Sequence, residues 1–150
     1  MSMPSGDHAV FPARLSALPE TAAFARDFCE RNSVSHDDAL RLTFIIEELF
    51  TNTVQHGYRG ESDAPIRVTL AMSGAHVTVL YEDAAPAYDP LALIHVKPST
   101  LNDSLESRPL GGLGSYLVGQ LVVAATYAYE QGTNRLWLTM PRAGEASSDN

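Results

Sequence analysis

The chain has 150 residues, of which 45% are hydrophobic and 19% charged, a composition typical of one soluble folded domain. Its formal net charge of −8 at pH 7 argues against nucleic acid and anionic membrane surfaces as partners, because the field around the protein repels both. A single cysteine, Cys29, excludes an internal disulfide, and no apolar stretch approaches the roughly 18 residues of a membrane-spanning helix.

Both ends of the chain are small and polar. We therefore expect loose tails at residues 1–7 and 143–150 and a single domain at residues 8–142. The N-terminus lacks the basic and then apolar pattern of a secretory signal, which together with the lone cysteine favours a cytoplasmic protein.

The first part of the domain predicts one strand and two helices. Residues 8–18 can supply a strand, and residues 18–32 place apolar side chains at helical spacing after an early proline. Ser35, followed three residues later by Asp38, is similar to a capping box, so a second helix is expected to begin there. Its pattern continues until Gly57, which makes this helix long.

The rest of the domain predicts two hairpins separated by a long loop and a helix. Residues 65–73 and 75–82 alternate apolar and polar residues around a short turn, which favours an antiparallel hairpin. Residues 84–112 contain four prolines and little periodicity, and a loop of that length is often a lid. Residues 113–125 are apolar enough for a third helix, and residues 126–141 favour a final hairpin.

This order of elements predicts the fold class. One strand, two helices, two strands, a lid, a helix and two strands indicate an α/β (α+β) sandwich of two layers. About three helices are expected on one face of a mostly antiparallel mixed sheet.

The second helix carries a polar row inside an apolar pattern. Glu48, Asn52 and His56 are four residues apart, so they lie about one turn from each other on one stripe. A carboxylate and an amide oxygen one turn apart can bind Mg²⁺, and the carboxylate can alternatively serve as a general base. The row can also be a plain solvated face that includes Glu47 and Gln55.

Two further segments are candidates for ligand contacts. Residues 109–118 place three glycines before an apolar helix, where uncovered backbone amides favour phosphate, although a flexible turn has the same composition. Neither a Walker lysine nor a third Rossmann glycine is present. Asp83 follows a predicted strand and can accept the exocyclic amine of adenine, or simply end the strand in a turn.

Together and in this order, the three segments resemble the ATP-binding motifs of the histidine-kinase-like (Bergerat-type) ATPase superfamily that includes DNA gyrase. The segment "EELFTNTVQHGY" at 47–58 resembles the N box. The segments "EDAAPAYDP" at 82–90 and "GGLGSYLV" at 111–118 resemble the first and second glycine boxes. The short length and the "HGY" and "YDP" sequences are most similar to stand-alone anti-sigma-factor serine kinases of the partner-switching type.

This resemblance implies a function and a set of partners. It implies an ATP lid, ATP and Mg²⁺ as cofactors, and phosphorylation of a serine on an anti-anti-sigma protein of the STAS type. It also implies that the protein sequesters a sigma factor or a similar regulator and forms a homodimer.

The resemblance also implies roles for individual residues. Asn52 would hold Mg²⁺, Glu48 would orient or deprotonate the attacking hydroxyl, and Asp83 would bind adenine. His56 matches the histidine of the N box, where it contacts nucleotide or packs against the lid. The remaining positions would bind the phosphates; they are Arg108, Gly111, Gly112, Leu113 and Gly114.

The first glycine box departs from the family's pattern. Where the family usually has a glycine two residues after the aspartate, this chain has Ala85, so a methyl group stands where backbone normally approaches the base. Overpacking typically costs about 1 to 3 kcal/mol, which is roughly a tenfold or larger loss of affinity. A binding module without catalysis, with weak or lost nucleotide binding, is therefore the alternative function.

Overall fold

The structure is a computed structural model and describes residues 6–94 and 112–142. Its five strands form one sheet in the order β1-β2-β3-β5-β4, and each neighbouring pair is antiparallel. The strands are β1 (Asp7–Pro12), β2 (Pro65–Ser73), β3 (His76–Asp83), β4 (Ala124–Glu130) and β5 (Thr133–Pro141).

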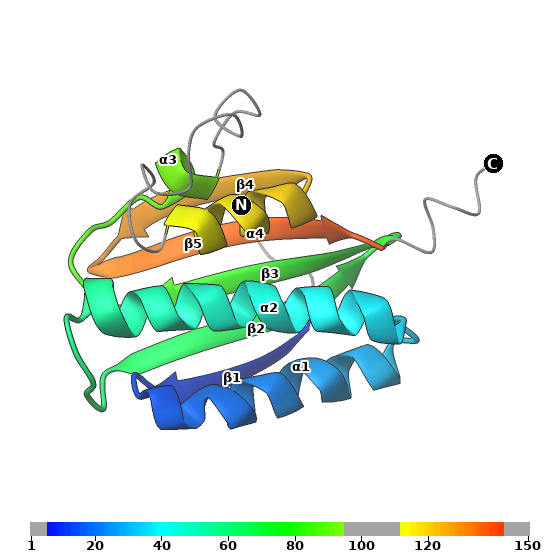
Figure 1. Cartoon of the computed structure of the whole chain (residues 1–150), viewed down its shortest axis with the longest axis horizontal. Coiled ribbons are helices and arrows are strands. Elements are labelled where there is room, and N and C mark those ends of the chain that lie inside the picture. The colour runs from blue at the N-terminus through cyan, green and yellow to red at the C-terminus, as the bar shows by residue number, and fades with distance from the viewer. Residues whose placement is uncertain (1–5, 95–111, 143–150) are drawn as a thin grey trace.

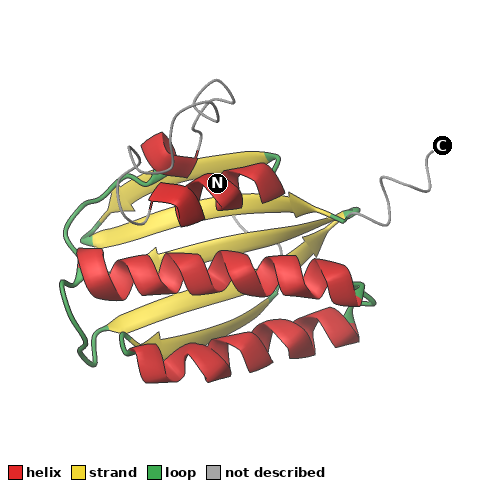
Figure 2. Ribbon diagram, viewed as in Figure 1, coloured by secondary structure: helices red, strands yellow, loops and turns green. Residues whose placement is uncertain are grey.

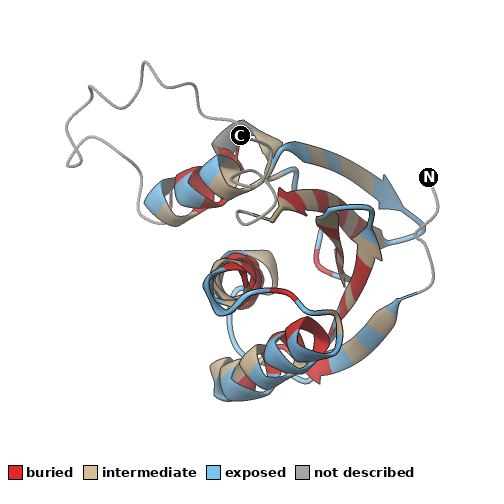
Figure 3. Ribbon diagram, turned by 90° about the vertical axis from the view of Figure 1, so that its right-hand side faces the viewer, coloured by how far each residue is buried: buried red, intermediate tan, exposed pale blue. Residues whose placement is uncertain are grey.

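Three longer helices cover one face of this sheet. They are α1 (Leu18–Arg31), α2 (His36–Asn52) and α4 (Gly112–Leu121). Figures 1 and 2 show α2 lying over the middle of the sheet, with α1 and α4 on either side of it. Seen from the side in Figure 3, all three helices lie on the same face. The predicted two-layer sandwich is therefore confirmed, and every strand pairing among the described residues is antiparallel.

Three short elements connect these layers. They are η1 (Leu15–Ala17), η2 (Thr53–Gly57) and α3 (Leu91–Ile94). The η2 segment continues α2 as one turn of π-helix, in which the N–H of Tyr58 donates to the carbonyl of Thr53 at 2.7 Å. Turns of this kind occur frequently at functional sites.

The sequence accounts for the start of α2. The Oγ atom of Ser35 accepts a hydrogen bond from the N–H of Asp38 at 3.1 Å, which satisfies one of the unpaired donors of the first turn. The expected capping interaction is therefore confirmed.

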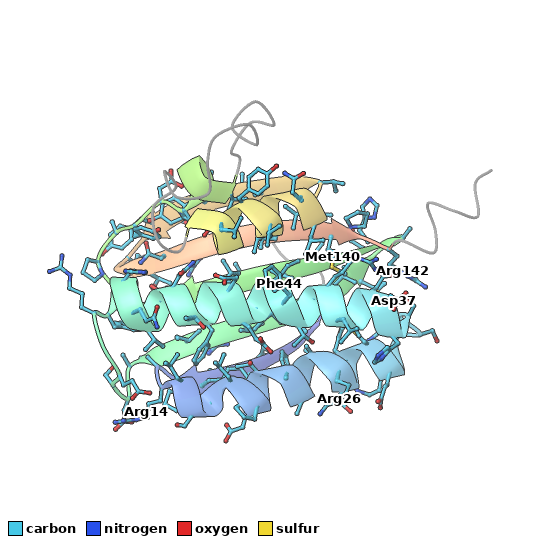
Figure 4. The ribbon with its side chains drawn as sticks, in the orientation of Figure 1. Arg14, Arg26, Asp37, Phe44, Met140 and Arg142 are labelled. Carbon is cyan, nitrogen blue, oxygen red and sulfur yellow. The ribbon has the colours of Figure 1, made fainter. Side chains whose placement is uncertain are left out.

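The core lies between the helices and the sheet. The ring of Phe11 on β1 contacts those of Phe24 and Phe50 edge-on, with centroids 6.0 and 6.4 Å apart. The central strands alternate buried and more exposed residues, as a strand with one covered face requires. In Figure 4 the labelled Arg14, Arg26 and Arg142 lie around the rim of the molecule, so these charges stay out of the core.

The third helix ends earlier than predicted. We expected it to reach Ala125, but α4 ends at Leu121 and β4 begins at Ala124. The N–H of Val123 donates to the carbonyl of Thr139 at 2.8 Å, so this apolar stretch already pairs with β5. A long-range strand contact, which local periodicity does not reveal, decides where this helix ends.

Other expectations are met only in part. The region predicted as a lid, 84–112, contains α3 and the first residue of α4, while its residues 95–111 lie outside the described residues. Asp7, expected in the N-terminal tail, already belongs to β1. No helix among the described residues is long and apolar enough to cross a membrane.

Candidate functional site

A pocket open to solvent lies where the ends of α2 and β3 meet α4 and the β4–β5 hairpin, with a cavity volume of about 40 Å³. The pocket is lined by Leu49, Asn52, Thr53, Gly57, Tyr81, Asp83, Ala85, Tyr88, Pro90, Ser115, Tyr127, Asn134 and Leu136.

Asp83 ends β3, as expected, and lines this pocket. Its Oδ1 atom accepts hydrogen bonds from the N–H of Ala85 at 3.0 Å and from Nδ2 of Asn134 at 2.9 Å. Its Oδ2 atom lies 3.1 Å from Oγ1 of Thr53, which can donate to it. Because each carboxylate oxygen can accept two hydrogen bonds, Oδ2 retains capacity for a donor from a ligand.

Two hydroxyl groups support the carboxylate. Oγ1 of Thr53 lies 2.7 Å from the hydroxyl of Tyr81, and both oxygens are within hydrogen-bonding distance of the carbonyl of Leu49. Burial raises the pKa of Tyr81 well above its usual value, so the phenol keeps its proton and donates it. When Tyr81 donates to Leu49, the proton of Thr53 is available for Asp83.

Asn52 lies at the other side of the pocket, in the last turn of α2. Its Nδ2 atom donates to Oγ of the buried Ser115 on α4 at 3.3 Å, which fixes the orientation of the amide. Its Oδ1 atom makes no hydrogen bond to any described residue, so this hard oxygen can bind a metal ion. No three His, Cys, Asp or Glu side chains gather into a metal site within the described part of the chain. Mg²⁺ therefore fits here only with most of its ligands supplied by phosphate and water.

Glu48 lies one turn before Asn52 and packs against the start of α4. A Cβ atom added to Gly114 would lie 2.2 Å from Cδ of Glu48, so a larger residue at that position would require the carboxylate of Glu48 to move. Burial, reinforced by the neighbouring Glu47, raises the pKa of the Glu48 carboxyl. A raised pKa makes this carboxylate a stronger proton acceptor, as a general base requires.

The methyl group of Ala85 is buried and lies over Gly57. A Cβ atom added to Gly57 would be 3.2 Å from Cβ of Ala85, which is closer than an ordinary carbon–carbon contact. Gly57 therefore leaves room for the methyl group of Ala85, which stands where the family usually has a glycine.

The remaining predicted residues lie elsewhere. His56 is exposed and, like Glu48, does not line the pocket. From this part of the chain the lining consists of Asn52 and the neighbouring stripe of Leu49, Thr53 and Gly57. A contact of His56 with nucleotide or with the lid therefore stays a prediction. Leu113 is 44% exposed and also lies outside the lining.

Two predicted phosphate-binding residues cannot be placed. Arg108 and Gly111 lie outside the described residues, and Gly112 is the first residue of α4. The expected glycine-rich helix start is therefore present in part.

Several residues that line the pocket were not predicted from the sequence. Thr53 lies beside Asn52 in the N box, and Tyr81 lies two residues before Asp83 on the same face of β3, so the known motifs could have indicated both. Asn134 and Tyr127 carried no signal, because they enter the pocket through the pairing of distant strands.

Comparison with known proteins identifies relatives over almost the whole domain. Residues 11–140 match the family described as the histidine kinase-like ATPase domain. The chain is 30% identical over 136 residues to the serine/threonine-protein kinase BtrW of Bordetella bronchiseptica, covering 88% of this chain and 94% of that protein. It is 24% identical over 132 residues to the serine-protein kinase RsbW of Listeria monocytogenes, covering 85% and 84%.

Solved structures share the fold at lower identity. The SiaB–SiaC complex of Pseudomonas aeruginosa matches with a TM-score of 0.64 at 13% identity, over 89% of this chain and 88% of that one. The RsbU and RsbW domains of a Mycobacterium tuberculosis protein match with a TM-score of 0.62 at 20% identity. In that case the match covers 93% of this chain but only 33% of the other.

Proposed function

The chain belongs to the histidine kinase-like ATPase family, and on this basis we propose that it is an ATP-dependent serine/threonine protein kinase of the anti-sigma type. Its substrate is a serine on a STAS-type anti-anti-sigma protein, and it sequesters a sigma factor or a similar regulator. It acts in the cytoplasm as a homodimer. The observation that carries this proposal is the pocket that brings Asn52 and Asp83 together beside α4.

Asp83 selects the base. The exocyclic amine of adenine donates to Oδ2, the carboxylate oxygen with remaining capacity, while the bonds to Oδ1 keep the carboxylate in place. A base that carries a carbonyl in place of the exocyclic amine would put its oxygen against Oδ2 of Asp83, and neither of these two oxygens carries a proton to donate. Such an unpaired contact is strongly unfavourable in a partly buried site.

The start of α4 and Asn52 bind the phosphates. The first N–H groups of a helix have no partner within it, and the helix dipole favours negative charge at that end. Asn52 holds Mg²⁺ through Oδ1, and the ion, when bound, neutralises the charge that builds up on the phosphates.

Glu48 performs the proton transfer. It accepts the proton of the serine hydroxyl as that oxygen attacks the γ-phosphorus of ATP, and the bond to the β-phosphate oxygen breaks to release ADP. The contact with Gly114 places this carboxylate beside the helix start that binds the phosphates. Attacking oxygen, base and phosphates are thereby held in one place.

The test combines nucleotide binding with transfer. Millimolar Mg-ATP is expected to raise the midpoint of thermal unfolding, because a ligand that binds only the folded state stabilises it. Label from γ-labelled ATP is expected on a serine of the antagonist captured from the native cell. Folded protein whose midpoint does not move with Mg-ATP would contradict the proposal.

A variant of Asp83 sharpens this test. Asp83→Asn should weaken ATP binding, because an amide presents fewer acceptors to the amine and to its present donors. Asp63→Asn is the matched control, since it makes the same change at an exposed carboxylate that pairs with Arg14 on the surface. Equal ATP affinity in wild type and Asp83→Asn would remove the role given to Asp83.

The second candidate is a binding module without catalysis, and the buried methyl of Ala85 in the pocket lining favours it. Under this proposal the chain captures the same regulator equally well with and without Mg-ATP. A pull-down performed in both conditions separates the two functions.

A further inference from the structure

Asn134 lies at the centre of a set of hydrogen bonds around the loop that follows β3. Its Nδ2 atom lies 2.9 Å from Oδ1 of Asp83, 2.9 Å from the carbonyl of Ala85 and 3.2 Å from that of Pro86. Its Oδ1 atom accepts hydrogen bonds from the N–H of Tyr88 at 3.1 Å and from the hydroxyl of Tyr127. This one side chain thus contacts the loop at four of the six residues from 83 to 88.

The chemistry of these partners fixes the orientation of the amide. All three groups around Nδ2 are oxygen acceptors, and both groups around Oδ1 can donate a proton. Turning the amide over would place Oδ1 against the carboxylate of Asp83 and against two carbonyls. Because Asn134 is only 8% exposed, water cannot relieve such a mismatch.

Strand pairing explains why Asn134 reaches this loop. Asp83 ends β3 directly opposite Asn134 on β5, so both side chains emerge on the same face of the sheet. Tyr127, one strand further on, supplies the hydroxyl that holds the amide oxygen. The β4–β5 hairpin therefore acts as a rigid support for the loop between β3 and α3.

We propose that Asn134 is a positioning residue of the nucleotide pocket, which sets both the course of the 83–88 loop and the base preference of Asp83. The proposal rests on the proposed binding of ATP. The amide occupies one position on Oδ1 of Asp83, and Ala85 occupies the other, so only Oδ2 remains for a ligand. Asn134 thereby determines that Oδ2 is the carboxylate oxygen that contacts the base, and Oδ2 remains an acceptor for the amine of adenine.

The experiment compares ATP with inosine triphosphate, which carries a carbonyl where adenine has its amine. Asn134→Ala is expected to lower the preference for ATP about tenfold or more, because the carboxylate loses a donor that orients it. The N–H of Tyr88 is shared between Oδ1 of Asn134 at 3.1 Å and the hydroxyl of Tyr127 at 3.0 Å. Asn134→Ala removes the first acceptor and the group that holds the second in place, so hydrogen exchange at this N–H should become faster.

A conservative variant separates the two sides of the amide. Asn134→Asp keeps the size and the acceptor for Tyr88 but places an oxygen against Asp83. It is expected to lose the ATP preference while the N–H of Tyr88 stays protected. If Asn134 only filled space, this variant would behave like wild type.

Asn32→Ala is the matched control. Asn32 also donates from its side chain to a backbone carbonyl, that of Phe28 at 2.8 Å, but it ends α1 far from the pocket. The Asn32→Ala variant should prefer ATP over inosine triphosphate to the same extent as wild type.

The outcomes distinguish this inference from the proposed function. If wild type binds ATP and both Asn134 variants keep its preference over inosine triphosphate, the role of Asn134 is wrong and the kinase proposal stands. If folded wild type binds neither nucleotide, the proposed function is wrong, and the base-setting role of Asn134 with it. Loss of preference in both Asn134 variants but not in Asn32→Ala supports the inference.

Discussion

The contact between Gly57 and Ala85 leads to a prediction about both stability and nucleotide affinity. Gly57→Ala places a methyl group 3.2 Å from that of Ala85 and 3.6 Å from Cγ2 of Thr53. The first distance is a few tenths of an ångström too short, so we expect a cost at the low end of overpacking, about 1 kcal/mol. Replacing glycine by alanine inside a helical turn stabilises by roughly 0.5 to 1 kcal/mol. The two effects nearly cancel.

The cancellation disappears when Ala85 is replaced by glycine. In the Ala85→Gly background the close contact is gone, so Gly57→Ala should stabilise by roughly 0.5 to 1 kcal/mol. Ala85→Gly alone removes a fully buried methyl group and adds backbone freedom, and should destabilise by about 1.5 kcal/mol. The double-mutant cycle is therefore expected to give a coupling energy of about 1 kcal/mol.

Urea unfolding of the four proteins measures this coupling. Additive changes, within about 0.3 to 0.5 kcal/mol, would refute the proposed contact between the two positions. Titration of the same proteins with Mg-ATP tests the consequence for function. If the methyl of Ala85 hinders the base, Ala85→Gly should bind ATP about tenfold more tightly although it is less stable. Unchanged affinity would mean that this methyl does not restrict the nucleotide.

Two further predictions concern the site, and a third concerns the buried Cys29 in the core. Glu48→Gln should bind Mg-ATP normally but transfer phosphate about 10²- to 10⁴-fold more slowly. Wild type should lose transfer rate as the pH falls and Glu48, whose pKa is raised, becomes protonated, whereas the rate of Glu48→Gln should not show this loss. Equal transfer rates in the two proteins would exclude the base role. Asn52→Ala should abolish the Mg²⁺ dependence of ATP binding measured by titration, and retained dependence would place the metal elsewhere. Burial raises the pKa of the Cys29 thiol to about 11, so above pH 9 the folded state keeps this proton while the unfolded state loses it. The free energy of unfolding of wild type should therefore fall between pH 9 and 11, and it should fall less steeply in Cys29→Ala.

Local patterns predicted most of the fold. The apolar spacing of α1 and α2 and the alternation in β2, β3 and β5 are properties of single segments, so the sequence displays them directly. The capping by Ser35 and the position of Asp83 at a strand end belong to the same class. The early end of α4 does not, since it depends on the pairing of Val123 with Thr139 in another strand.

The pocket was predictable only where a motif names its residues. Asn52 and Asp83 come together as the resemblance implies, whereas Asn134 lies 51 residues from Asp83 along the chain and meets it only through strand register. The four-residue spacing suggested one stripe for Glu48, Asn52 and His56. Of these three only Asn52 lines the pocket, together with Leu49, Thr53 and Gly57 on the neighbouring stripe, and a four-residue period alone cannot specify which stripe faces a pocket.

The hydrogen bonding of the pocket bears on whether Ala85 has removed nucleotide binding. Buried side-chain atoms without a hydrogen-bond partner among the described residues are found at His76, Arg135 and Trp137, none of which lines the pocket. Of these atoms, Nε of Arg135 still forms an ion pair with Oε2 of Glu82 at 3.2 Å. By strand alternation these three lie on the face of the sheet opposite the helices. Among the described residues, the fully buried polar side-chain atoms of the pocket lining thus have hydrogen-bond partners before any ligand binds.

Such a pocket does not need a ligand to fold. Two acceptors of the pocket remain open: Oδ1 of Asn52, which could bind a metal ion, and Oδ2 of Asp83, which could accept a hydrogen bond from an amine. Neither needs such a ligand for the protein to fold. ATP binding should therefore add to the stability of a protein that is already folded. The partly buried carboxylate of Asp83 keeps its donors beside Ala85, so we expect this alanine to change the affinity for nucleotide rather than to disrupt the site.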